Sequence, residues 1–226
     1  PPMGQEQHQK QRKKHKHYPL LDIGTLGGPG TFVASIDSRG RVAGGALTSI
    51  PDPVCTGPWH QEGGCYYEHA FKGREGVLAD LGTLPGGSNS WASAANSRGV
   101  VFGVSENGLP DPVYGLRAFV ATIWKDGEVQ DLGTLGGGLS FPGYAINQRG
   151  QAVGAASNTD PDPDGFATAV VFAPDVIFPG VHWHATLWQD GAIQDLGTLG
   201  DGLDSNALFV NERGQVAGIA YTNSVP

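Results

Sequence analysis

The chain has 226 residues, of which 36 are Gly, 16 are Pro and 2 are Cys, and its formal net charge is −8. This composition, without any long amphipathic helical pattern, indicates many short strands joined by turns, and no stretch is long and apolar enough to span a bilayer. Residues 1–17 carry five basic side chains against one acidic one, so residues 18–226 hold a charge of −12, which argues against nucleic acid as a ligand.

The first segment, residues 1–17, is a short basic arm. Its charge and its lack of aromatic residues predict a disordered, solvated arm ahead of one repeat domain over residues 18–226. The chain has no initiator Met and no signal peptide, which we interpret as a processed or excised piece of a longer protein.

Four copies of one motif organise residues 18–226. The motif is Asp-(Ile/Leu)-Gly-Thr-Leu followed by glycine, and its copies begin at Asp22, Asp80, Asp131 and Asp195. A second motif, Asp/Asn-x-Arg-Gly, follows each copy after 15 or 16 residues and begins at Asp37, Asn96, Asn147 and Asn211. A small apolar run that ends in glycine comes next. The recurrence identifies a repeat protein, with units at about 27–84, 85–135, 136–199 and, incomplete, 200–226.

Each complete unit is expected to form four antiparallel strands. A turn with Asp or Asn first and Gly fourth joins the first two strands, which is typical of a type I turn whose Gly has a positive φ. The second strand is the small apolar run, where Gly103 and Gly154 mark the close approach of a neighbour. The third strand ends near Trp124 or Trp188, a tight Gly-containing turn follows, and the repeat motif forms the fourth strand. With a lone strand at Tyr18–Leu26 and two strands over 203–221, about 15 strands are expected.

Repeated four-stranded meanders pack radially as blades of a β-propeller or stack as a linear array. Small residues in the inner strands and one Trp per blade favour the propeller, with about four blades, the last one incomplete. The links between the second and third strands, roughly 48–66, 106–116 and 157–182, then share one end with the Gly-rich links after each fourth strand. Variable loops on a rigid scaffold usually carry function, so we expect this end to bind ligands.

The repeat residues resemble those of the HAF family of extracellular repeat proteins. The resemblance rests on His69-Ala70-Phe71, on His184-Ala185-x-x-Trp188, and on the two repeat motifs, and it covers about residues 18–221. It implies a bacterial, exported protein with a β-propeller-like fold, in the extracellular space or the periplasm, and it implies no particular activity. Arg117 and Val120 stand in the second unit where the family His is expected, which indicates that this His is not a catalytic requirement.

Residues at repeated positions are interpreted as scaffold. The Asp that begins each first motif is expected to hydrogen-bond to the amides of its turn and so fix the link between units. Trp124 and Trp188 are predicted core residues, and His69 and His184 are predicted strand histidines with satisfied hydrogen bonds.

The two cysteines, Cys55 and Cys65, lie ten residues apart in the first long link. In an exported protein they are expected to form a disulfide. The alternative is a pair of zinc ligands with His60 and His69, for which the Cys spacing is wide.

A weak calcium motif lies in the third long link. Asp160, Asp162 and Asp164 alternate with proline and precede Gly165, as in the first half of a calcium loop, but Val171 stands where a bidentate Glu is needed. Asp-Pro also occurs in the other two links, which favours a stiff, solvated loop element over a calcium site.

Aromatic residues in the long links are the predicted ligand-binding residues, with a structural role in packing the loops as the alternative. They are Trp59, Tyr66, Tyr67, Phe178, His182 and Trp183. Such rings can stack on sugars or anchor a peptide. The sequence therefore predicts a non-catalytic binding module for a carbohydrate or an extracellular protein. The alternatives are a lyase or hydrolase with acids on the same face, and a purely structural surface protein.

Overall fold

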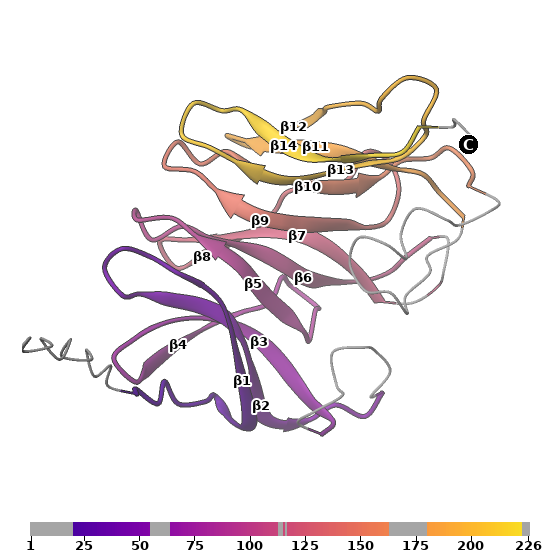
Figure 1. Ribbon diagram of the computed structural model, residues 1–226. Coiled ribbons are helices and arrows are strands. Elements are labelled where there is room, and N and C mark those ends of the chain that lie inside the picture. Colours follow the sequence, from indigo (N-terminus) through magenta and orange to yellow (C-terminus); the bar gives the residue numbers. More distant parts are fainter. Residues whose placement is uncertain (1–19, 55–63, 113–114, 116, 163–179, 223–226) are drawn as a thin grey trace, which may run out of the picture.

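The computed structural model describes residues 20–54, 64–112, 115, 117–162 and 180–222. These residues contain no helix and form 14 strands in four antiparallel sheets (Figure 1). No helix in this part of the chain is long and apolar enough to cross a membrane. The all-β prediction is confirmed.

Three sheets have four strands, each hydrogen-bonded to the next in chain order. The first contains β1 (Gly27–Ile36), β2 (Val42–Pro51), β3 (Tyr66–Arg74) and β4 (Val77–Gly82). The second contains β5 (Ser90–Ala95), β6 (Val101–Pro110), β7 (Arg117–Lys125) and β8 (Glu128–Asp131). The third contains β9 (Ser140–Ile146), β10 (Ala152–Ser157), β11 (Trp183–Gln189) and β12 (Ala192–Asp195). The fourth contains β13 (Ser205–Val210) and β14 (Val216–Ala220), so the predicted antiparallel meanders are present. The prediction that the repeat motif forms each fourth strand is wrong: β8 and β12 end at its first residue, and β4 ends at its third. The strand ends there because the motif Asp accepts the amide two residues further on and so turns the chain.

The lone strand predicted at Tyr18–Leu26 is wrong over its described part. Residues 20–25 belong to no strand, and Leu26 makes only an isolated bridge to Thr48. A fourth strand is held by pairing with a third strand, as β4 is by β3, and the described residues offer no such neighbour to this segment. Its Asp22 nevertheless accepts a hydrogen bond from the amide of Gly24, at 2.9 Å, so the local turn persists without the sheet.

Both predicted kinds of hairpin turn are present. In the turn after β7, Asp126 and Gly127 have φ values of 54° and 86°, the pair of positive angles that an Asp-Gly hairpin adopts. In the turn after β5, the amide of Gly99 donates to the carbonyl oxygen of Asn96 at 3.0 Å, and Gly99 has a φ of 89°.

Glycine in the second strand permits the close approach that its position predicted. A Cβ at Gly103 in β6 would overlap the carbonyl oxygen of Trp91 in β5, next to a register shift in that strand. Gly154 in β10 meets the carbonyl oxygen of Phe141 in β9 in the same way. The bulged first strand of each sheet therefore lies directly against a glycine of the second strand. A side chain in place of that glycine would push the two strands apart.

The sheets lie face to face in chain order (Figure 1). The first strand of each sheet packs on the preceding sheet: β5 lies against β1, β2 and β3, and β9 and β13 repeat this arrangement one sheet further on. Trp124 and Trp188 are buried in the core clusters, where Trp188 packs against Phe102 with ring centroids 6.0 Å apart. Their prediction as core residues is confirmed.

Hydrogen bonds from one repeated serine connect each sheet to the next. The hydroxyl of Ser140 in β9 accepts from the amide of Ala121 at 2.8 Å and donates to the carbonyl oxygen of Gly133 at 2.8 Å. Ser90 and Ser205 make the same two bonds at the other two junctions. We call these three residues the serine staples.

Candidate functional site

The two ends of the sheets carry different kinds of connection between strands. The tight turns gather at one end, at the left in Figure 1, and the long and Gly-rich links gather at the other. We call the second end the link end; it includes the last residues of β2, β6 and β10 and the first residues of β3, β7 and β11. The end with the tight turns is built from repeated residues, so the link end is where function is expected.

The first residue of each repeat motif serves the scaffold. Asp80 accepts a hydrogen bond from the amide of Gly82 at 2.8 Å, and Asp195 accepts one from Gly197 at 2.7 Å. Each also pairs with a strand histidine, His69 Nδ1 at 2.9 Å from Asp80 and His184 Nδ1 at 2.8 Å from Asp195. The predictions that this Asp fixes its turn and that these histidines are satisfied are confirmed.

A charged network occupies the link end where the first two sheets meet. The guanidinium of Arg117 pairs with Glu106 at 3.0 Å and with Asp52 at 3.4 Å. The side-chain amide of Asn89 donates to Glu106 at 2.9 Å and faces Asp52 at 3.5 Å. Both carboxylates are buried, so each needs these cationic and amide partners.

Arg117 is held in place by this network and still reaches solvent. Burial lowers the pKa of its guanidinium, but the hydrogen bond and charge of Glu106 and the charge of Asp52 outweigh that effect, so the net pKa is raised. Its side chain is 34% exposed and lies over the ring of Tyr67, 6.0 Å from the centroid. Tyr66 and Tyr67 are half-buried at the start of β3.

Glu68 follows Tyr67 in β3. Its carboxylate fills the space that a side chain at Gly45 would occupy, next to Trp91. Burial raises the pKa of Glu68 to about 7. The equivalent positions in β7 and β11 are Phe119 and Trp183, so an acid stands here where the other two sheets place an aromatic side chain.

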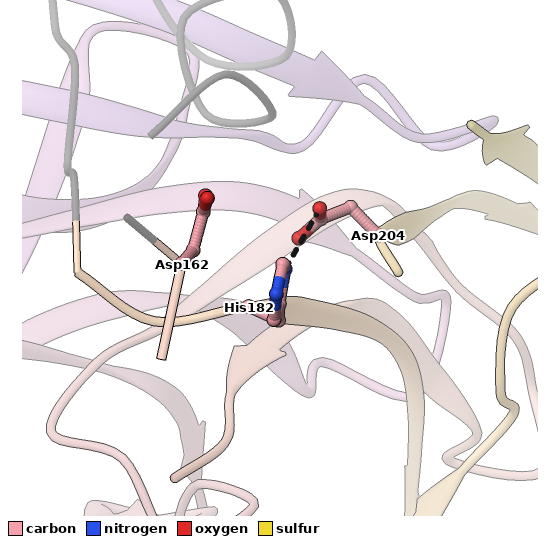
Figure 2. Close-up of side chains that lie close together, drawn as sticks. All are labelled: Asp162, His182 and Asp204. Atoms are coloured by element: carbon pink, nitrogen blue, oxygen red, sulfur yellow. Dashed lines mark hydrogen bonds and ion pairs between the residues drawn. The ribbon is translucent and has the colours of Figure 1, made fainter. Parts of the chain in front are cut away.

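A second cluster lies at the link end where the third and fourth sheets meet (Figure 2). Asp162 in the β10–β11 link, His182 before β11 and Asp204 before β13 offer ligand atoms that all lie within 4.8 Å of one another. Asp204 accepts from the Trp183 amide at 2.8 Å, and its other oxygen lies 3.0 Å from His182 Nδ1. Asp162, His182 and Asp204 are 6%, 9% and 9% exposed.

Tyr221, the residue directly after β14, contacts Asp204 of this cluster. Its amide donates to the backbone oxygen of Asp204 at 3.0 Å. Burial, together with the negative charge of Asp204, raises the pKa of the Tyr221 hydroxyl.

The residues predicted for ligand binding separate into four groups. Tyr66 and Tyr67 are accessible at the link end, beside Arg117. Trp183 is 3% exposed and packs against Phe141 with ring centroids 5.6 Å apart, so the structure places it in the core and not on a binding surface. His182 is buried and belongs to the second cluster, whereas Trp59 and Phe178 lie outside the described residues.

The remaining predicted sites fall partly outside the described residues. Cys55 and Asp164 are among the undescribed positions, so the disulfide with Cys65 and the calcium loop stay predictions. The backbone closes the base of the first link, because the amide of Asp52 donates to the carbonyl oxygen of Cys65 at 2.9 Å. The structure groups Asp162 with His182 and Asp204, a combination that the sequence analysis missed. Alignment of the repeats could have pointed to Asp204, because it directly precedes the staple Ser205 as Asn89 precedes Ser90.

Comparison with known proteins adds no relative. No protein-family model, no curated protein and no solved structure matches this chain. The HAF resemblance therefore stays a prediction from the repeat residues.

Proposed function

We propose that the chain is part of a secreted, HAF-type β-propeller protein and acts as a non-catalytic binding module through its link end. The preferred ligand is a carbohydrate, with an extracellular protein as the other candidate. The four sheets would be blades; their face-to-face packing in chain order supports this arrangement.

One observation carries the proposal: the guanidinium of Arg117 lies over the ring of Tyr67 and is fixed from below by two buried carboxylates. Asp52 has counterparts in the other sheets, but Arg117, Glu106 and Tyr67 do not recur at the equivalent positions, so the scaffold does not explain these three residues. A fixed cation beside a half-buried ring offers hydrogen-bond donors next to a flat apolar surface. Sugars present that same combination of hydroxyl groups and C–H faces.

An array of immobilised oligosaccharides tests the proposal, followed by calorimetric titration of the best ligand. We expect Tyr67→Ala to weaken binding at least tenfold, because stacking on an aromatic ring is removed. Tyr144→Ala is the matched control, since Tyr144 is 57% exposed on β9 and lies away from the link end. Equal loss of affinity in both variants, or no sugar bound at all, would contradict the carbohydrate proposal.

A lyase or hydrolase is the second candidate. The observation that favours it is the convergence of two carboxylates, Asp162 and Asp204, on one histidine. The burial of all three side chains favours binding over turnover, because a substrate needs access to the acid and the base. Turnover of any bound oligosaccharide that is abolished by Asp204→Asn would establish the enzyme.

A further inference from the structure

We propose that Asp162, His182 and Asp204 bind one divalent transition-metal ion of the zinc class. The three side chains supply two carboxylate oxygens and one imidazole nitrogen within 4.8 Å of one another. They come from the β10–β11 link, from the residue before β11 and from the residue before β13, so the ion would join the third and fourth sheets (Figure 2). The site is separate from Tyr67 and Arg117 and does not depend on what they bind.

The junction between the first two sheets provides an internal comparison. Asp52 corresponds there to Asp162, because each donates its amide to the residue four positions before a strand histidine. The distances are 2.9 Å to the carbonyl oxygen of Cys65 and 3.1 Å to that of Gly180. The fold therefore places the two carboxylates equivalently.

The partner of this carboxylate differs between the two junctions. Asn89 and Asp204 are equivalent, since each precedes a serine staple and accepts a backbone amide from the neighbouring third strand, at 2.9 Å and 2.8 Å. At the first junction the amide of Asn89 faces Asp52 at 3.5 Å. At the third junction, a second carboxylate stands in place of that amide. An anion has thus replaced a hydrogen-bond donor in a buried site.

Two buried carboxylates in one site require positive charge. His182 supplies at most one unit when it is protonated, which leaves the three side chains with a net charge of −1 or below. At the first junction, the buried pair Asp52 and Glu106 holds the guanidinium of Arg117 between them. A divalent cation would supply the equivalent charge at the third junction.

The ligand set selects the class of ion. An imidazole nitrogen with two carboxylate oxygens suits zinc and its first-row neighbours, whereas calcium takes oxygen ligands. A point equidistant from three atoms 4.8 Å apart lies about 2.8 Å from each, so movements below about 1 Å reach zinc–ligand distances of about 2.0–2.2 Å. Three protein ligands leave a fourth position for water.

Calorimetric titration of zinc into the metal-stripped full chain tests the proposal. His8, His15 and His17 in the arm should first be replaced by Ala, because they can bind the same ions. We expect one equivalent of zinc to bind with a Kd of about 10 µM or below, and calcium to bind at least a hundredfold more weakly. Asp204→Asn recreates the carboxylate–amide pair of the first junction, retains an oxygen for the Trp183 amide, and should weaken zinc binding at least tenfold.

Asp80→Asn is the matched control, because it also removes a carboxylate beside a histidine and keeps the acceptor for its turn amide. It should leave zinc binding unchanged. If Asp204→Asn does not give a cooperative melting transition, Asp162→Asn replaces it. The proposal is overturned if the folded variant, Asp204→Asn or Asp162→Asn, binds zinc as tightly as the parent chain does. Zinc binding by Cys55 and Cys65 would give that result. Failure of the parent chain to bind zinc below about 1 mM also overturns it.

Discussion

The side-chain amide of Asn96 donates to the backbone oxygen of Asn147 at 3.0 Å, across 51 residues and from one sheet to the next. Asn147 repeats this bond to the backbone oxygen of Asn211 at 2.9 Å. The side-chain oxygens of the same residues accept amides within their own turns, at 3.0–3.1 Å for Asn96. At these two hairpins, one Asn side chain thus closes the turn and also connects it to the following sheet.

Replacing Asn96 with Asp separates these two tasks. The turn keeps its acceptor oxygen, whereas the bond to Asn147 is lost and a charge is buried, since Asn96 is 3% exposed. We expect the free energy of unfolding to fall by about 2–4 kcal/mol, measured by urea denaturation. Asn211→Asp is the matched control: Asn211 is exposed and its amide bonds only within its own turn, so a change below about 0.5 kcal/mol is expected. Equal effects would show that Asn96 acts only within its turn.

Removing a serine staple should loosen the junction between two sheets. Ser140→Ala leaves the amide of Ala121 and the carbonyl oxygen of Gly133 without this hydroxyl, and Ser140 is fully buried. We expect a loss of about 2–3 kcal/mol in the free energy of unfolding. Thr31 occupies the same position in β1 and its hydroxyl bonds to the carbonyl oxygen of Gly24, so Thr31→Val should cost about 1 kcal/mol or less. A larger loss of unfolding free energy for Thr31→Val than for Ser140→Ala would contradict the role of Ser140 in holding two sheets together.

Glu68 should make stability depend on pH. Its pKa is raised from 4.5 to about 7 in the folded chain by burial, so the folded state binds the proton more tightly than the unfolded state. The resulting stability is present below pH 4.5 and is lost as the pH rises towards 7. Compared with the parent, Glu68→Gln should be about equally stable at pH 4 and about 3 kcal/mol more stable at pH 8.

Thermal or urea unfolding of both chains between pH 4 and pH 8 measures this difference. Glu75→Gln removes the same charge from an exposed hairpin and controls for the change in net charge. A difference between Glu68→Gln and the parent that is constant with pH would show that Glu68 titrates alike in the folded and unfolded states.

The features that the sequence predicted well are local ones. The hydrogen bond from Gly82 to Asp80 spans two residues, and the Asp126-Gly127 turn is set by the φ values these residues adopt. Gly103 was also predictable, because a glycine inside an apolar strand has few explanations other than close approach. The residues of such a motif determine its local geometry without contacts from distant parts of the chain.

The features that the sequence missed depend on contacts between units. Asp162 and Asp204 are 42 residues apart in sequence and meet only because successive sheets pack face to face. Trp183 was predicted to bind a ligand because it ends a long link, but the alternation of strand β11 turns its ring into the core. The predicted strand at Tyr18–Leu26 failed because a fourth strand forms only beside a third strand, and no third strand lies beside this segment among the described residues. In these cases the position of a residue depends on how successive units pack and align with one another, and the spacing of motifs within one unit does not reveal it.

The most direct test of the proposed function is hydrogen–deuterium exchange of the chain with and without its best-binding oligosaccharide. Slower exchange is predicted at the link end, for the amides of Tyr67 and of the first residues of β7, with no change in the turns that begin at Asn96 and Asn147. Protection confined to those turns, or spread evenly over both ends of the sheets, would contradict the assignment of ligand binding to the link end.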